Sequence, residues 1–331
     1  MGRSVKLRSL AKINLDLRVL NKNADNFHEL RTVFQTVSLA DTIEVDYTPS
    51  RKTELSIDDP QAIPDNLILR AARATLDALR VKATVRFRLT KKIPMGGGLG
   101  GGSSNAAAVL LALPVLAGRA LPLSRAIEIG SRLGSDVPFF LLGGTALALG
   151  RGTELYPLPE IAAEPLLILS TGLHIATGPA YGALGRSLTF MGASSSINTF
   201  QSYVRALVET RSAGAASALS ANDFESAVSG QFPQLKKIQA KLSRLGAAGV
   251  RMTGSGSAVV AMFTSRGERE RARTMLLRDR MFEGCRIMPA ALVSRRSYRA
   301  LWRRQLSGHV LNEHGGNPGT EVWPLPSRYG R

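Results

Sequence analysis

Apolar and polar side chains alternate strictly from Val81 to Thr90. A period of two is typical of a strand with one buried face. A similar strand-rich pattern runs from Lys6 to Tyr47, where a polar turn at 22–26 precedes a second apolar run over 30–39. The first ninety residues therefore predict a sheet whose long early strands are joined by a turn.

Helical spacing appears in three segments of the first half. Apolar residues share one stripe over 65–79, with Asp65 expected as the N-cap. An Ala/Leu-rich run follows Ser103-Ser104-Asn105, whose polar side chains are expected to cap a second helix. Pro114 lies inside that run, and because proline removes a helical hydrogen bond, we expect a kink or an early stop near Leu113. A third helix is predicted over 123–133 and a strand over 143–149.

Prolines at 157, 159 and 165 mark the expected domain boundary. Beyond it the patterns predict strands at 166–170 and 286–292, a hairpin-like region at 250–264, and helices at 200–209, 235–245 and 268–277. Strands and helices that alternate without a long βαβ repeat favour an α+β fold. We expect an N-terminal domain over 1–157, a C-terminal domain over 158–294 and a basic extension over 295–331.

The extension is expected to be partly disordered. Tyr298, Leu301, Trp302 and Leu306 could form one apolar face of a short terminal helix with arginines opposite. A helix docked on the body, or frayed, is favoured over one that binds RNA or a membrane surface. After Ser307 the Gly, Asn and Pro content predicts little independent structure.

Composition narrows the class of protein. With 44% hydrophobic and 21% charged residues, the 331-residue chain is typical of a globular protein with room for two domains. The single cysteine, Cys285, fits a reducing compartment, and no apolar run reaches the roughly 20 residues of a membrane span, so we expect a cytoplasmic protein without membrane partners.

The formal charge of +18 raises the possibility of nucleic-acid binding. Five of those charges belong to 295–331, and the others are mixed with acids along amphipathic segments. A solvated basic surface is therefore the favoured interpretation, and we expect no nucleic-acid partner.

Residues 94–105 read Pro-Met-Gly-Gly-Gly-Leu-Gly-Gly-Gly-Ser-Ser-Asn, between a predicted strand and a predicted helix. Glycines allow positive φ and let backbone N–H groups approach phosphate oxygens, while the helix dipole adds positive potential. A flexible linker is the alternative, but linkers are seldom flanked so regularly. The segment matches neither a Walker A loop nor the dinucleotide Gly-x-Gly-x-x-Gly. The candidate phosphate-binding residues are Pro94, Met95, Gly96, Gly97, Gly98, Leu99, Gly100, Gly101, Gly102, Ser103 and Ser104.

This loop resembles the glycine-rich ATP loop of the GHMP kinase superfamily. Its doubled triple glycine followed by Ser-Ser-Asn-Ala-Ala is similar to the members that phosphorylate the 2-hydroxyl of 4-diphosphocytidyl-2-C-methyl-D-erythritol in non-mevalonate isoprenoid synthesis. The resemblance implies a ribosomal S5 domain 2-like N-terminal half, a ferredoxin-like C-terminal half, and ATP with Mg²⁺. Kinases of the homoserine or mevalonate type, whose loop is usually shorter, remain an alternative, and an RNA-binding module is a further one.

Two charged residues are candidates for the chemistry. Lys12 and Asn14 share one face of the first strand, because side chains alternate. Taken alone, Lys12 would be a residue at the surface, and Asp136, within Gly-Ser-Asp-Val-Pro-Phe-Phe, would be a helix cap or turn residue as readily as a base. The resemblance implies that Lys12 lies in the active site and that Asp136 accepts the hydroxyl proton.

The resemblance also implies residues for the cytidyl substrate. Asp-Asn-Phe-His-Glu-Leu at 25–30 is similar to the family's Asp-Gly-Tyr-His-Glu-Leu, in which the aromatic stacks on cytosine and the histidine contacts its edge. Phe27 keeps the stacking face but lacks the phenol, and His28 alone would more often be a surface histidine. Tyr181 falls where a second aromatic would be expected, and Asn14 is assigned to the substrate as well.

Two further motifs lie in the second half. The segment 252–259 resembles the superfamily's third motif, a glycine turn expected to face the first loop, and Asn222 to Glu225 is interpreted as structural. Magnesium leaves no compact signature, so its ligands stay unknown, with Ser104 as a candidate hydroxyl near it. The sequence leaves a monomer and a homodimer equally open.

Overall fold

The structure is a computed structural model that describes residues 2–22, 28–173, 175, 177–185, 193–310 and 323–329. Its strands are β1 (Arg3–Lys22), β2 (His28–Pro49), β3 (Glu54–Asp58), β4 (Ala83–Thr90), β5 (Thr145–Gly150), β6 (Glu154–Pro157), β7 (Pro165–Ser170), β8 (Gly249–Met252), β9 (Val259–Met262) and β10 (Arg286–Ala291). Its α-helices are α1 (Leu67–Leu79), α2 (Gly101–Ala117), α3 (Leu123–Leu133), α4 (Val137–Leu142), α5 (Thr177–Ala183), α6 (Ala193–Thr210), α7 (Ala213–Ala216), α8 (Asp223–Ser229), α9 (Pro233–Arg244), α10 (Arg266–Leu277) and α11 (Arg295–Gln305). Short 3₁₀ turns, η1 (Ser217–Leu219) and η2 (Arg280–Phe282), complete the described elements.

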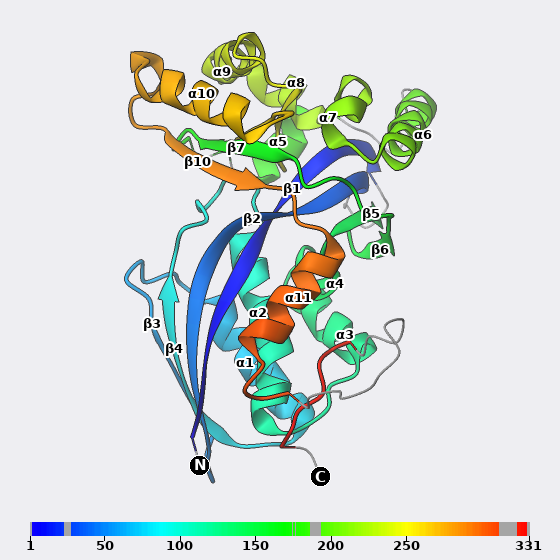
Figure 1. Cartoon of the computed structure of the whole chain (residues 1–331). Helices are drawn as coiled ribbons and strands as arrows, with labels where there is room; N and C mark the ends of the chain where they lie inside the picture. Colours follow the sequence, from blue (N-terminus) through cyan, green and yellow to red (C-terminus); the bar gives the residue numbers. More distant parts are fainter. Residues whose placement is uncertain are drawn as a thin grey trace.

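The first sheet is built around β2. It has the order β3-β4-β2-β5-β6, and β1 pairs with β2 along nearly its whole length. All described pairings in it are antiparallel except β3 with β4. From Ser9 to Leu20 both faces of β1 are buried, because the strand passes from the first half of the molecule into the second (Figure 1).

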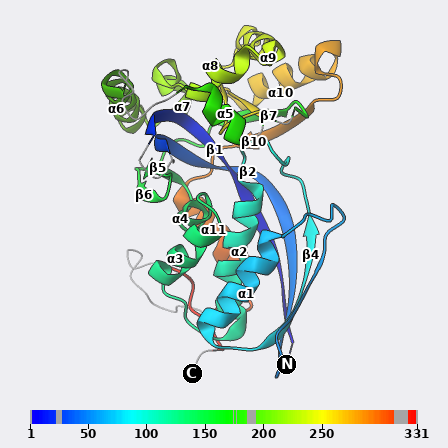
Figure 2. The same ribbon diagram turned by 180° about the vertical axis from the view of Figure 1, so that it is seen from behind.

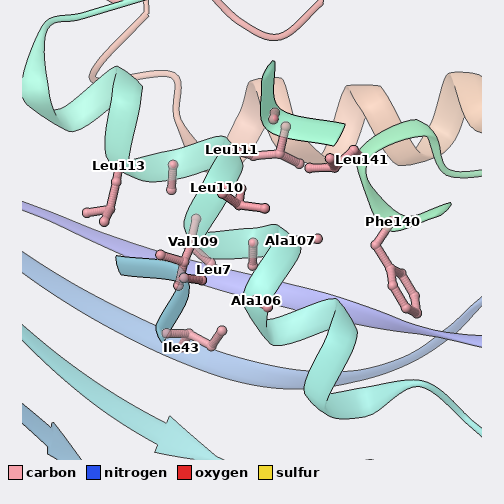
Figure 3. Packing of buried hydrophobic residues seen from close by; sticks show 14 of the residues in the cluster. Leu7, Ile43, Ala106, Ala107, Val109, Leu110, Leu111, Leu113, Phe140 and Leu141 are labelled. Atoms are coloured by element: carbon pink, nitrogen blue, oxygen red, sulfur yellow. The ribbon is translucent and has the colours of Figure 1, made fainter. Parts of the chain in front are cut away.

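Helices α1 and α2 cover one face of this sheet. They pack side by side with the long strands beside them, as the view from behind shows (Figure 2). Helix α2 is apolar on all sides, as expected of a helix surrounded by protein, and Val109 and Leu110 are 1% exposed (Figure 3). The core of the first half therefore centres on α2.

The second sheet has the order β10-β7-β9-β8, all antiparallel. Numbered along the chain, this is 4-1-3-2 with helices between the first and second strands and between the third and fourth, the ferredoxin-like arrangement. The α+β fold class and both predicted halves are confirmed. The domain limits at 157 and 294 stay a prediction, although β6 ends the first sheet and β7 begins the second.

Three local predictions were wrong. The N-cap of α1 is Asn66, whose side chain accepts from the Ile68 amide, whereas Asp65 pairs with Arg70. Helix α2 begins at Gly101 after Gly100, which adopts a left-handed conformation, so the predicted polar residues do not cap it. It also continues through Pro114 to Ala117, so the alternative of an early stop near Leu113 is excluded.

The described parts of the C-terminal extension lie against the first half of the molecule. Helix α11 is docked, with Tyr298 and Trp302 buried. Residues 323–329 also lie on the body, where the Trp323 indole and the Ser327 hydroxyl donate to backbone carbonyls of the first half. Proline and glycine content predicted the absence of regular elements but not this tertiary docking. No described helix is long and apolar enough to cross a membrane.

Candidate active site

The glycine loop lies where β4 leads into α2, as predicted. Gly98 and Gly100 have φ angles of +72° and +67°, which residues with a side chain rarely adopt. A Cβ on Gly98 would lie 2.3 Å from the carbonyl oxygen of Thr253, and one on Gly100 would lie 2.9 Å from the Phe140 ring. Backbone at this loop therefore touches both the second glycine turn and α4, with no room for side chains.

Helix α2 begins directly after Gly100, so its first N–H groups lack partners within the helix. Such a helix start, preceded by a loop of exposed backbone, is a ready site for phosphate. Gly98 lines the adjacent cleft, whereas the side chains of Leu99 and Ser104 are buried. Any contribution from these two residues to phosphate binding would come from their backbone.

Sequence reasoning missed the residues that anchor the loop. Asp41, fully buried, accepts from the amides of Lys92 (2.7 Å) and Ile93 (2.8 Å) and pairs with the Lys91 ammonium. A Cβ on Gly101 would lie 2.9 Å from Lys91 Nζ. Asp41 thus fixes the segment that leads into the glycine loop. In the sequence, the one feature that could have indicated this role is a single carboxylate beside an apolar run.

Lys12 and Asp136 meet, although 124 positions separate them in the sequence. Lys12 Nζ lies 3.5 Å from Asp136 Oδ2, with the lysine side chain 5% exposed and the aspartate 29%. Lys12 Nζ also donates to Asn14 Oδ1 (2.8 Å) and lies 4.8 Å from the centre of the Phe34 ring. Asp136 occupies the N-cap position of α4, but its carboxylate makes no capping hydrogen bond and lines the cleft instead.

Asn14 joins this pair to the second glycine turn. Its Oδ1 accepts from the Gly254 amide (3.0 Å) and the Thr253 hydroxyl (3.3 Å), and its Nδ2 donates to Thr32 (2.8 Å). The expectation that the two glycine segments face each other is confirmed. Because the Asn14 amide oxygen is held by protein groups, only its remaining N–H could serve a substrate.

A cleft of about 1070 Å³ opens beside these groups. Both halves of the molecule line it, and among the described residues there, Lys12, Lys22 and Arg151 are cationic while Asp136 is the only carboxylate. An excess of positive charge in a concave site favours polyanionic ligands. Lys22 and Arg151 were not predicted, although Arg151 is flanked by glycines in the sequence.

The far wall of the cleft carries the predicted base-binding residues. His28 stacks on Tyr181 with ring centres 4.9 Å apart and planes 20° from parallel, and the edge of Tyr181 meets Phe224. Burial, and after it the charge of Asp136, raises the pKa of Tyr181 to about 12. Its ring is therefore a neutral stacking surface at physiological pH. Phe27 lies outside the described residues.

No group of three or more His, Cys, Asp or Glu side chains that could hold a metal occurs in the part of the chain that the structure describes. The Ser104 hydroxyl, our candidate near magnesium, is buried and donates to the Leu10 carbonyl (2.6 Å). Side-chain oxygens that line the cleft include the Asp136 carboxylate and the hydroxyls of Ser131, Ser135, Thr153 and Ser255.

Comparison with known proteins decides the family. Residues 66–144 match the GHMP kinases N terminal domain, and residues 181–281 match the GHMP kinases C terminal model. The chain is 50% identical to the 4-diphosphocytidyl-2-C-methyl-D-erythritol kinase of Solibacter usitatus, over 99% of this chain and 98% of that one. This chain belongs to the GHMP kinase family.

Other relatives agree. The kinase of the same name from Gloeobacter violaceus is 36% identical over 81% of this GHMP kinase and 88% of its own length. A crystal structure titled 4-(cytidine 5'-diphospho)-2C-methyl-D-erythritol kinase superposes with a TM-score of 0.71 at 34% identity, covering 87% of this chain and 98% of that one. Homoserine kinase from Cytophaga hutchinsonii shares only the fold, with a TM-score of 0.65 at 20% identity. The family predicted from the glycine loop is confirmed, and the protein is a small-molecule kinase.

Proposed function

We propose that this GHMP kinase transfers the γ-phosphoryl group of ATP to the 2-hydroxyl of 4-diphosphocytidyl-2-C-methyl-D-erythritol. The observation that carries the proposal is the meeting of Lys12 and Asp136 beside the glycine loop, in a cleft whose far wall presents His28 and Tyr181. Two relatives named as the kinase of this substrate, at 50% and 36% identity, support the same assignment.

Each end of the cleft suits one of the two substrates. The loop amides and the start of α2 would hold the ATP phosphates, since backbone N–H groups there have no helical partner. The stacked rings of His28 and Tyr181 would hold the cytosine base together, by stacking and edge contact. Lys22 and Arg151 would face the diphosphate between base and alcohol.

Asp136 would accept a proton while the phosphoryl group is transferred to the alcohol beside it. Its carboxylate accepts the hydroxyl proton while the alcohol oxygen bonds to the γ-phosphorus, and the bond from that phosphorus to the bridging oxygen breaks to release ADP. Lys12, fixed by Asn14 and lying over Phe34, would offset the charge gathering on the transferred oxygens. Binding and orientation thus account for most of the catalysis.

Mg²⁺ fits this site as an ion carried largely by the nucleotide. Magnesium usually keeps several waters and takes one or two carboxylates plus substrate phosphates, and Asp136 with the cleft hydroxyls supplies such oxygens. When bound it would neutralise charge on the phosphates. A cytoplasmic location, and a monomer or homodimer without nucleic-acid partners, stay predictions.

The decisive test replaces Asp136 by asparagine, which keeps the shape but cannot take a proton. We expect kcat with ATP and the cytidyl alcohol to fall about a hundredfold or more, while nucleotide affinity measured by calorimetry changes little. Asp58→Asn, which removes a carboxylate on exposed β3 paired only with Arg88, is the matched control and should behave like wild type. Wild-type turnover in Asp136→Asn would refute the assignment.

Substrate class is tested separately. Purified wild-type enzyme should phosphorylate the cytidyl alcohol, and it should phosphorylate homoserine and mevalonate at most weakly, because neither offers a base to Tyr181. Faster turnover of homoserine or mevalonate than of the cytidyl alcohol would refute the proposed substrate and indicate another GHMP kinase substrate.

A further inference from the structure

The C-terminal end of α4 depends on groups from the far end of the chain. The last four carbonyls of any helix lack partners within it, and α4 has only six residues. The carbonyl of Phe139 accepts from the Gly143 amide (2.8 Å). The next two accept from the extension: Phe140 from the Tyr298 hydroxyl (2.5 Å) and Leu141 from the Trp323 indole (2.7 Å).

The hydrogen bond from Tyr298 is buried where water could not easily replace it, and the one from Trp323 is partly buried. Phe140 and Leu141 are fully buried, and Tyr298 is 2% exposed. The Tyr298 ring lies so close to Gly143 that a Cβ there would be 2.2 Å from its Cδ1, and a Cβ on Gly144 would be 2.7 Å from the Arg295 amide nitrogen. The loop after α4 is therefore shaped to the extension.

The extension is itself anchored at several points. Arg295 donates to the Thr145 carbonyl (2.5 Å), and Ser327 donates to the Val115 carbonyl near the end of α2 (2.6 Å). In Figure 1 α11, in orange, is drawn in front of α2, and the view from behind in Figure 2 places α2 in front of α11. The contacts on α4 thus come from a docked element rather than from a loose tail.

Helix α4 connects this element to the proposed catalytic groups. Its N-cap residue is Asp136, and the Phe140 ring packs against Gly100 of the glycine loop, so the same residue contacts the loop with its side chain and Tyr298 with its carbonyl. Figure 3 shows the side chains of Phe140 and Leu141 leaving α4 in different directions, Leu141 toward Leu111 of α2.

We propose that Tyr298 and Trp323 are positioning residues, which cap α4 and thereby hold Asp136 at the distance from Lys12 and the glycine loop that turnover needs. The role for Asp136 rests on the proposed function, but the capping of α4 does not.

The first measurement does not involve activity. Hydrogen exchange of a peptide spanning 137–144 is followed by mass spectrometry in wild type, Tyr298→Phe, Trp323→Phe and Tyr329→Phe. Tyr329→Phe is the matched control, because its hydroxyl bonds His309 within the extension and does not contact α4. We expect exchange in this peptide to rise about tenfold in the first two variants and to stay at the wild-type rate in the control.

The second measurement links the cap to Asp136. Tyr298→Phe and Trp323→Phe should lower kcat about three- to tenfold with KM for both substrates nearly unchanged, and Tyr329→Phe should not. In an Asp136→Asn background the same substitutions should lower kcat by less than twofold, because the group they position is already lost. An effect on the structure that does not act through Asp136 would lower kcat by the same factor in both backgrounds.

The outcomes separate the two proposals. Wild-type exchange of 137–144 in both Tyr298→Phe and Trp323→Phe overturns the cap, whatever the kinetics. Raised exchange with unchanged kcat, or equal losses in both backgrounds, overturns the link to Asp136. If instead Asp136→Asn alone turns over like wild type, the proposed function fails while the exchange result still decides the cap. Either variant suffices if the other does not fold.

Discussion

At the scale of single residues, the main feature is a buried lysine whose ion pair is long. Lys12 is almost entirely buried, and among the described residues its ammonium lies 2.8 Å from Asn14 Oδ1, 3.5 Å from Asp136 Oδ2 and 4.8 Å from the centre of the Phe34 ring. Burying an ammonium costs free energy unless partners compensate. A phosphate arriving at the glycine loop would supply a strong partner, so the site is arranged to bind a further anion.

The phenol of Tyr181 makes a testable contribution to stability at alkaline pH. Because its pKa of about 12 exceeds the ordinary value of 10, the folded state keeps a proton that the unfolded state loses between those values. Stability from this group is therefore complete below pH 10 and is lost as pH rises toward 12. We expect Tyr181→Phe to show a shallower fall in unfolding free energy than wild type above pH 10, measured by urea titration at stepped pH.

Tyr156→Phe, at an exposed position on β6, is the control for removing a phenol. It should follow the wild-type curve more closely than Tyr181→Phe does. Identical slopes for wild type and Tyr181→Phe would show that burial does not perturb this hydroxyl.

At the scale of elements, periodicity and glycine content predicted the strand, loop and helix that form the proposed phosphate site. They failed at the ends of α2, because glycine in a left-handed conformation replaced the polar cap and because α2 tolerates Pro114 in its last turn. They could not pair Lys12 with Asp136, since that contact depends on how β1 and α4 pack, and here the resemblance to a family supplied the prediction. Asp41, Lys22 and Arg151 lay in no recognised motif and were missed.

Because the two glycine segments are in contact, a single methyl group added at Gly98 is expected to weaken ATP binding strongly. In Gly98→Ala the new Cβ would overlap the Thr253 carbonyl, and alanine would also have to adopt a φ of +72°. A left-handed residue with a side chain costs about 1–2 kcal/mol, so we expect KM for ATP to rise about tenfold or more. Steady-state kinetics at saturating cytidyl alcohol measure it.

Gly102→Ala provides the comparison within the same loop. Its Cβ would meet only the Leu67 side chain at 3.5 Å, an ordinary contact, and alanine favours the first turn of a helix. We expect KM for ATP to change less than about threefold. Equal effects of both substitutions would mean that the methyl acts by blocking phosphate, not by separating the two glycine segments.

At the scale of the whole molecule, hydrogen bonds donated by backbone amides hold the walls of the cleft together. Strand β1 enters the second half, where the Leu17 amide donates to the Ala221 carbonyl (2.8 Å) and the Val19 amide donates to Asp223 (2.9 Å). In return the Ala221 amide donates to Asp16 (2.7 Å). The two halves therefore behave as one frame around the site, which local sequence patterns do not reveal.

Asn222 connects these hydrogen bonds between the two halves to the proposed catalytic residues. Its Oδ1 caps α8 through the Phe224 amide, and its Nδ2 donates to the carbonyls of Met252 (2.8 Å) and Gly254 (2.9 Å). Because the Gly254 amide in turn donates to Asn14, the expected structural role of Asn222 extends to the turn that faces the glycine loop.

Replacing Asn222 by alanine should therefore lower stability and ATP binding together. Loss of the cap and of two buried donors predicts a fall of about 2 kcal/mol in unfolding free energy and a several-fold rise in KM for ATP. Asn66→Ala removes a cap of the same kind from α1, away from the cleft, and should cost about 1 kcal/mol with unchanged KM. Asn222→Asp, which retains the capping oxygen but not the donors, should raise KM at least as much as alanine. If it kept the wild-type KM, the turn would not depend on Asn222, and its link to the site through Asn14 would be refuted.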